Sequence, residues 1–189
     1  WKRFDQRAMP DGEAKARFEE YFAVFPWNDL PLKAEGFDMG CGSGRWAKLV
    51  APKVGKLICI DASAEALDIA KRNLNDISNT EFLHSGVSEQ PLPPNSQDFG
   101  YSLGVLHHIP NTLNALRDCV KLLKPRAPFL VYLYYKFDNR PIWYVIIWRL
   151  SDIIRRLISI MPSTLKSLIT NTIGAIIYFP LARLALLGE

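Results

Sequence analysis

Two acidic residues and a run of alternating glycines could together bind a nucleoside. Asp38 precedes the segment GCGSG at residues 40–44, and Asp61 follows about twenty residues later. Glycines suit a turn whose backbone takes a positive φ or lets a ligand approach closely. A helix after such a turn offers free N–H groups to a negative group. Because a carboxylate at the end of the next strand suits two ribose hydroxyls, the pattern predicts a nucleoside cofactor site.

The elements that must hold these residues form a strand, a turn, a helix and a second strand. Apolar residues at 36–39 and 56–60 predict the strands, and residues 45–50 predict the helix between them. Further helices are predicted over 13–25, 64–74 and 112–123, and further strands over 80–84, 97–103 and 127–135. Alternating strands and helices imply parallel βαβ units with right-handed crossovers.

The glycine spacing separates two classes of cofactor. A dinucleotide fingerprint is G-x-G-x-x-G, whereas here the third glycine comes one residue early. Asp38 also lies two residues before the first glycine, where a carboxylate suits an ammonium or a sulfonium better than a pyrophosphate. The stretch DMGCGSG at residues 38–44 resembles the first motif of the class I S-adenosylmethionine (SAM)-dependent methyltransferases. A nicotinamide-dependent oxidoreductase is the rival that this spacing disfavours.

The resemblance covers residues 34–135 and implies an α/β, Rossmann-like, doubly wound and mainly parallel sheet with strand order 3-2-1-4-5. It places Asp38 near the methionine end of SAM, Asp61 on the ribose hydroxyls, and Ala62 beside the adenine. The amides at 40–42 should border the cofactor, and S-adenosylhomocysteine is the expected product. The complete set of implied cofactor-binding residues is Asp38, Gly40, Cys41, Gly42, Gly44, Asp61, Ala62, Gly86, Val87, Leu103 and Gly104.

The adenine contact departs from the family pattern. Members of the class often have an Asp near the position of Gly86, where it takes the adenine amino group. This chain has no acid there. The contact then falls to the backbone of Gly86 and Val87, or to the side chain of Ser88 or Glu89.

Two adjacent histidines, His107 and His108, follow the predicted fourth strand. This segment resembles the region of the type 11 methyltransferases that lines the methionine half of SAM and faces the acceptor. His107 is therefore the candidate donor or base toward the acceptor, and His108 is expected to be structural. Adjacent residues on a helix do not face one another, and no acidic or cysteine partner has ligand spacing nearby, so no metal is expected.

The end of the chain differs from the part before it. Residues 141–187 are predicted to be helical, with a break at 161–163. Residues 140–189 carry six basic and two acidic side chains, whereas the first 139 carry seventeen of each. A membrane span needs about twenty apolar residues, and the sixteen uncharged residues from 167 to 182 fall short. The predicted domains are a SAM-binding core at 1–139 and a helical cap, insertion or interface segment at 140–189.

Several roles stay open for this helical tail. Residues 141–187 could cover the cofactor cleft, pair with a second copy, or rest on a membrane surface. The two further strands of the class I fold are not found, so strand five would be an exposed edge, which proteins avoid. We therefore expect the natural protein to continue beyond Glu189.

We expect a cytoplasmic methyltransferase, or alternatively one with peripheral membrane contact. A small apolar acceptor is expected, because residues 132–148 are rich in apolar and aromatic side chains. Cys41, Cys59 and Cys119 form no CxxC pair, so they are expected to be packed thiols in a reducing compartment. No nucleic-acid partner is expected, since the basic residues are too sparse. The alternative is a non-catalytic SAM-binding partner protein that uses the helical tail as an interface.

Overall fold

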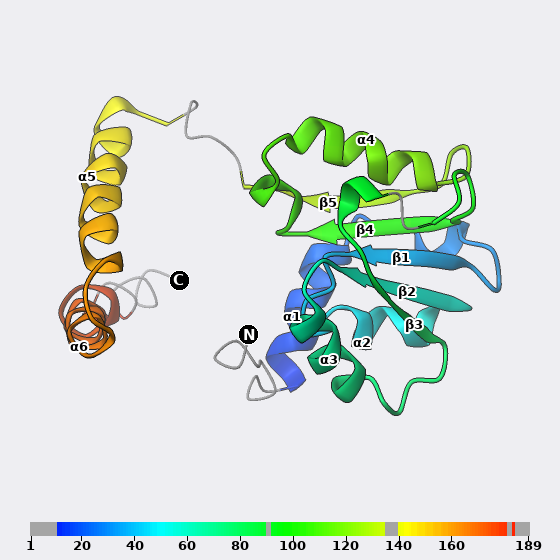
Figure 1. Cartoon of the computed structure of the whole chain (residues 1–189), viewed down its shortest axis with the longest axis horizontal. Coiled ribbons are helices and arrows are strands. Elements are labelled where there is room, and N and C mark those ends of the chain that lie inside the picture. Colours follow the sequence, from blue (N-terminus) through cyan, green and yellow to red (C-terminus); the bar gives the residue numbers. More distant parts are fainter. Residues whose placement is uncertain (1–10, 90–91, 135–139, 181–182, 184–189) are drawn as a thin grey trace. The chain divides into compact units, whose positions relative to one another are not determined.

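The computed structural model describes residues 11–89, 92–134, 140–180 and 183 (Figure 1). The chain forms two compact units, Trp1–Tyr134 and Tyr135–Glu189. The domain boundary expected after residue 139 stays a prediction, because residues 135–139 lie outside the described part of the chain.

Within the described residues of the first unit, five strands form one parallel sheet in the order β3-β2-β1-β4-β5. The predicted α/β, Rossmann-like fold and its strand order are confirmed. The strands are β1 (Glu35–Met39), β2 (Lys56–Asp61), β3 (Thr80–His84), β4 (Phe99–Leu103) and β5 (Phe129–Tyr132).

The edge strand β5 is shorter than the predicted strand over 127–135, whose last residue is not described. Its pairing with β4 ends where the N–H of Gly104 donates to the carbonyl of Tyr132, at 3.0 Å. Gly104 has a φ of +76° and turns the chain away from the sheet. Leu133 and Tyr134, the described residues that follow directly, therefore do not pair with β4.

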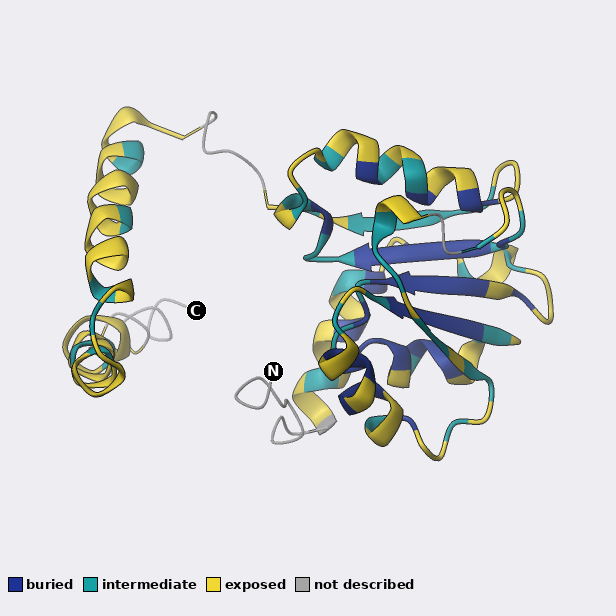
Figure 2. Ribbon diagram, viewed as in Figure 1, coloured by how far each residue is buried: buried dark blue, intermediate teal, exposed yellow. Residues whose placement is uncertain are grey.

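Helices cover both faces of the sheet. They are α1 (Asp11–Phe22), α2 (Ala47–Val50), α3 (Ala64–Asn73) and α4 (Thr112–Leu122). The first three lie on one face and α4 lies on the other (Figure 1). On the first face Phe22 is 2% exposed and stacks on Phe18, with ring centroids 4.5 Å apart. The central strands are buried from both sides (Figure 2), which holds their carboxyl ends in fixed positions.

The second unit is helical where it is described. It contains α5 (Ile142–Ser159) and α6 (Ser163–Ile173), and α6 continues as a π-helical segment, Gly174–Tyr178. The last turn predicted over 181–187 falls outside the described residues, apart from Arg183. Among the residues that the structure describes, no helix is both long enough and apolar enough to span a bilayer.

Candidate functional site

A cavity of about 340 Å³ opens where β1 and β2 end, beside the turns that follow β3 and β4. Its volume is typical of small-molecule sites. In open α/β sheets, ligands bind at this edge, where the strand order reverses. The cavity is lined by Met39, Gly40, Asp61, Ala62, Ser85, Gly86, Val87, Ser88, Glu89, Val105, His108 and Ile109. The lining therefore contains five of the eleven implied cofactor-binding residues, Gly40, Asp61, Ala62, Gly86 and Val87, and also Ser88 and Glu89, the side chains named for the adenine contact.

The carboxylate of Asp61 joins the glycine turn to the start of α3. Its Oδ2 accepts a hydrogen bond from the N–H of Gly42, and its Oδ1 accepts one from the N–H of Ser63, both at 2.8 Å. A carboxylate oxygen has more than one lone pair. Asp61 can therefore hold the loop and still accept hydrogen bonds from hydroxyl groups in the cavity that it lines.

The glycine turn is bonded to β2 through its own amides. The N–H groups of Gly40 and Cys41 both donate to the carbonyl of Ile60, at 2.8 and 3.0 Å. Gly40 and Gly42 have φ values of +81° and +56°, in the left-handed region that favours glycine. The three amides expected to border the cofactor thus already have partners within the protein, and they shape the turn.

Six of the eleven expected residues lie outside the cavity lining: Asp38, Cys41, Gly42, Gly44, Leu103 and Gly104. Gly44 faces α3, where an added Cβ would lie 2.8 Å from Cδ1 of Leu74, so this glycine permits close helix packing. Leu103 packs against the core on the α1 side of the sheet. Gly104 follows it at the end of β4, and an added Cβ there would meet open space.

Asp38 is buried in the middle of the sheet rather than on the cavity surface. It is 2% exposed, and it pairs in register with Cys59 on β2 and Tyr101 on β4. Its Oδ2 and the Tyr101 hydroxyl have no hydrogen-bond partner among the described residues. Burial raises the pKa of Asp38 to about 7, the Tyr101 hydroxyl partly offsets this, and the negative charge of Asp61 adds to it.

The cysteines are packed thiols, as expected. Cys41, Cys59 and Cys119 are all buried and free. Contact with Cys59 and then burial raise the pKa of Cys41, and burial raises the pKa of Cys119 to about 12. Such thiols stay protonated and are poor nucleophiles.

The two histidines differ from expectation in their geometry. They lie on a single 3-10 turn, Leu106–His108, with ring centroids 4.1 Å apart, so the expectation that they would not face one another is wrong. Tyr134 packs beside both rings, with centroids 4.1 Å from His107 and 6.4 Å from His108. The described residues contain no group of three or more His, Cys, Asp or Glu side chains that could hold a metal ion.

His108, which was expected to be structural, lines the cavity, whereas His107 does not. Both ring nitrogens of His107 are buried and lack a hydrogen-bond partner among the described residues. Burial, and secondarily the nearby His108, lower the pKa of His107. His107 is therefore neutral near pH 7, with an acceptor nitrogen that nothing described in the protein uses.

Glu89 organises the loop after β3. Its Oε2 accepts hydrogen bonds from the N–H of Gly86, at 3.0 Å, and from the hydroxyl of Ser85, at 2.9 Å. Both bonds lower the pKa of Glu89, and the bond from the Gly86 amide has the larger effect. The backbone donor of Gly86 is thus already in use, while Glu89 itself lines the cavity.

Sequence reasoning missed some of the lining. Val105, His108 and Ile109 belong to the segment that follows β4, and Met39 and Ser85 end β1 and follow β3. Their position was a usable signal, because the carboxyl ends of parallel strands meet at one edge of the sheet.

Comparisons with known proteins agree with this geometry. A family model described as "Methyltransferase domain" matches residues 37–131, which is half of the 189-residue chain. A solved structure of the YcgJ protein from Bacillus subtilis superposes with a TM-score of 0.57 at 21% identity, covering 69% of this chain and 54% of that one. At this identity the likeness supports the fold alone.

Two curated relatives are similar over the same part of the chain. Demethylmenaquinone methyltransferase of Bacillus licheniformis is 29% identical over 101 residues, covering 51% of this chain and 43% of that protein. The tRNA (carboxymethyluridine(34)-5-O)-methyltransferase of Schizosaccharomyces pombe is 35% identical over 116 residues, covering 59% and 47%. The chain thus spans less than half the length of either relative. It belongs to the methyltransferase domain family of class I, SAM-dependent proteins, and SAM is the cofactor that this membership implies.

Proposed function

We propose that the chain transfers the methyl group of SAM to a small apolar acceptor in the cytoplasm. The observation that carries the proposal is the carboxylate of Asp61 at the rim of the cavity, bonded to both the glycine turn and the start of α3. The family and the activities in the relatives' names favour transfer over a non-catalytic SAM-binding role.

The residues present fit a nucleoside with an amino-acid arm. Asp61 would accept from the two ribose hydroxyls, and the apolar surfaces of Ala62 and Val87 would border the adenine. Leu103 and Gly104 would form the inner wall, with Asp38 toward the methionine end. When bound, SAM supplies an electrophilic methyl group on a sulfonium. The chain's own task is then to align the acceptor and exclude water.

Glu89 is the proposed partner of the adenine amino group, because that amine needs an acceptor and the Gly86 carbonyl already accepts from the Glu89 N–H at 3.2 Å and the Ser85 hydroxyl at 3.1 Å. Glu89→Ala should lower the affinity for SAM about tenfold, the effect of one hydrogen bond to a charged group. Glu89→Gln keeps an acceptor for the Gly86 N–H, so its affinity for SAM should fall less than that of Glu89→Ala. Titration calorimetry measures both. The control is Glu81→Ala, since Glu81 pairs with Lys56 at 2.6 Å and does not line the cavity. If Glu89→Ala binds SAM as tightly as the wild type, the adenine amino group is bound by backbone atoms and not by Glu89.

The acceptor should meet an aromatic surface beside the carboxyl ends of β4 and β5. Tyr132 packs against Tyr21, with centroids 5.0 Å apart, and Tyr134 packs against His107 at 4.1 Å. Tyr132 is 41% exposed and Tyr134 is 65% exposed, so both rings are available. Residues 1–139 carry equal numbers of basic and acidic side chains, which gives no electrostatic preference for a nucleic acid. These features favour a quinone- or lipid-like acceptor.

His107 is the proposed hydrogen-bond partner or base for that acceptor. His107→Phe keeps a ring against Tyr134, so its affinity for SAM should match the wild type while methyl transfer slows at least tenfold. The wild-type rate should rise as the pH passes upward through the lowered pKa of His107, and the variant should lose this step. Equal rates with identical pH profiles would leave His107 as a packing residue.

The whole proposal is tested in two stages. The first is calorimetric titration with SAM, S-adenosylhomocysteine and NADH. Micromolar affinity for SAM and S-adenosylhomocysteine, with no binding of NADH, supports SAM as the cofactor. Binding of NADH but of neither other compound would overturn the proposal. The second is transfer of labelled methyl from SAM to demethylmenaquinone or to tRNA. Methyl label in the quinone supports an apolar acceptor. Label in the tRNA and none in the quinone would show that the acceptor is a nucleic acid instead.

A further inference from the structure

The helix α5 has one continuous apolar face. At 100° per residue, its isoleucines, leucines and first tryptophan fill an arc of roughly 160°. Most of these side chains are more than half exposed, and they include Ile142, Trp143, Ile146, Leu150, Ile153 and Leu157. Figure 2 shows the exposed residues along α5. An isolated amphipathic helix does not leave such a surface in water without a partner.

Cations border this apolar face on both sides. On the same helical projection, Arg149 and Arg156 flank one edge and Arg155 flanks the other. Asp152 lies in the middle of the polar face, where it forms ion pairs with Arg155 and Arg156. Since the chain's whole positive excess lies in residues 140–189, the charge is concentrated where the apolar face is.

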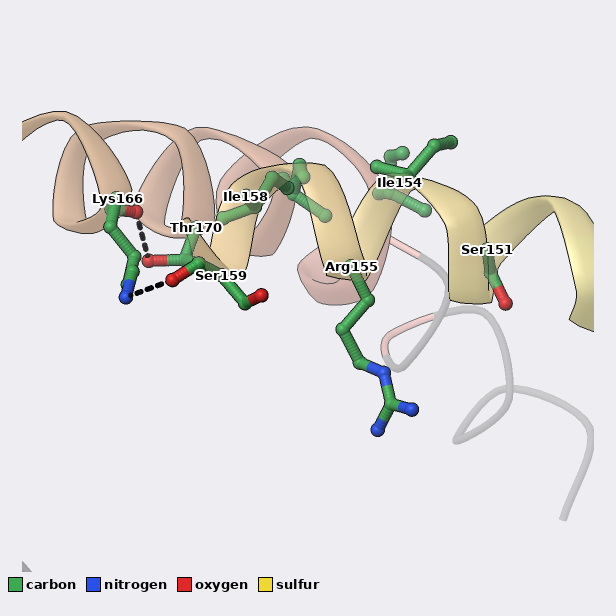
Figure 3. Close-up of a pocket in the computed structure, with 9 residues that line it drawn as sticks. Ser151, Ile154, Arg155, Ile158, Ser159, Lys166 and Thr170 are labelled. Carbon is green, nitrogen blue, oxygen red and sulfur yellow. Dashed lines mark hydrogen bonds between the residues drawn. The ribbon is translucent and has the colours of Figure 1, made fainter. Parts of the chain in front are cut away.

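A groove of about 510 Å³ between α5 and α6 extends the apolar surface. Its apolar lining comes from Ile158 of α5 and Ile173 of α6, among others, while Arg155 and Lys166 line it with positive charge. The Lys166 ammonium donates to the carbonyl of Ser159 at 2.9 Å, which joins the two helices. Figure 3 shows Ile154 and Arg155 leaving α5 on opposite sides. The groove therefore carries apolar side chains and positive charge side by side.

We propose that α5 and α6 bind the surface of an anionic phospholipid bilayer, with the apolar face of α5 in the acyl region and the arginines at the phosphates. Charge complementarity decides between this occupant and a second copy of the chain. A symmetric pairing through the same face would bring the arginine borders of both copies together, and like charges repel. Anionic headgroups instead attract the net positive charge that remains on these borders, where three arginines face the single carboxylate of Asp152.

The experiment is sedimentation of the full chain with vesicles of phosphatidylcholine, with or without about 30% phosphatidylglycerol. Binding to the anionic vesicles should be at least tenfold stronger than to the neutral ones and should weaken with salt. Ile146→Glu with Ile153→Glu should lower anionic binding at least tenfold. The matched control, Ser167→Glu with Asn171→Glu, adds the same charge to polar positions of α6 and should change binding less than threefold.

Each other outcome overturns the proposal. Absence of vesicle binding by the wild type excludes a bilayer partner. Equal losses in the two double variants would mean that net charge, not the apolar face, governs binding. A wild-type dimer in analytical ultracentrifugation that becomes monomeric only in the Ile146/Ile153 variant, without vesicle binding, would assign the face to a second copy. Unchanged calorimetric affinity for S-adenosylhomocysteine in the variants shows that the first unit is intact.

Discussion

Asp61→Ala should lower the affinity for SAM about a hundredfold, the largest effect that we expect from a single substitution at the cavity. Two hydrogen bonds from ribose hydroxyls to a charged acceptor contribute roughly 1.5 kcal/mol each. The substitution also leaves the N–H groups of Gly42 and Ser63 without their acceptor. We therefore expect a loss of folding stability of about 2 kcal/mol beside the loss of affinity.

A matched carboxylate separates the two effects. Asp98 also holds a backbone amide, that of Glu35 at 3.0 Å, and pairs with Lys124 at 2.7 Å, but it does not line the cavity. Asp98→Ala should destabilise the fold without changing the affinity for SAM. Calorimetry and urea unfolding measured on both variants make the comparison. If both variants lose affinity in proportion to stability, Asp61 has no specific role with the ribose.

Asp38→Asn should make the cofactor-free protein more stable at pH 8, by on the order of 4 kcal/mol. The pKa of Asp38 is raised to about 7 in the folded chain, against about 3.9 when unfolded. Between these values the folded state binds more protons than the unfolded state. Stability therefore falls as the pH rises from about 4 to 7, and the ionised, buried carboxylate remains unfavourable above that range. An amide cannot ionise, so the variant avoids the cost.

Urea unfolding of both proteins at pH 5, 6, 7 and 8 measures this effect. The stability difference between variant and wild type should be about 1.5 kcal/mol at pH 5 and should grow to about 4 kcal/mol at pH 8. The lowered pKa of His107 contributes with the opposite sign, but this contribution is common to both proteins and cancels in the difference. A pH-independent difference would show that Asp38 does not titrate in this range. If Asp38 faces the methionine ammonium, the stabilised variant should bind SAM more weakly.

Much of the fold was predictable because its signals are local. Apolar runs such as residues 56–60 and amphipathic runs such as 112–123 mark β2 and α4 within their own sequence. The strand order came from resemblance, since no local pattern specifies which strands pair. The contacts of Gly36 and Gly100 illustrate the limit: an added Cβ at either position would lie 2.4 Å from the ring of Phe99 or Phe37 on the neighbouring strand. Such reciprocal packing depends on register between distant segments.

The site was predicted in outline and not in detail for the same reason. Asp61 and Ala62 follow β2 directly, so their position could be inferred from the chain alone. Whether an amide in the glycine turn is free depends on where the carbonyl of Ile60 lies, which is a tertiary property. Which of the two histidines lines the cavity is likewise a tertiary property, and both rings also contact Tyr134, two residues after the end of β5.

The bonds between the glycine turn and β2 have a consequence for how SAM would be received. Because the amides of Gly40, Cys41 and Gly42 are bonded to residues 60 and 61, the turn is preorganised by the same ladder that builds the sheet. Ordering a loop on binding costs conformational entropy, and a turn that is already in place avoids that cost. Recognition at this turn then rests on shape and on the Asp61 carboxylate, with little contribution from induced fit.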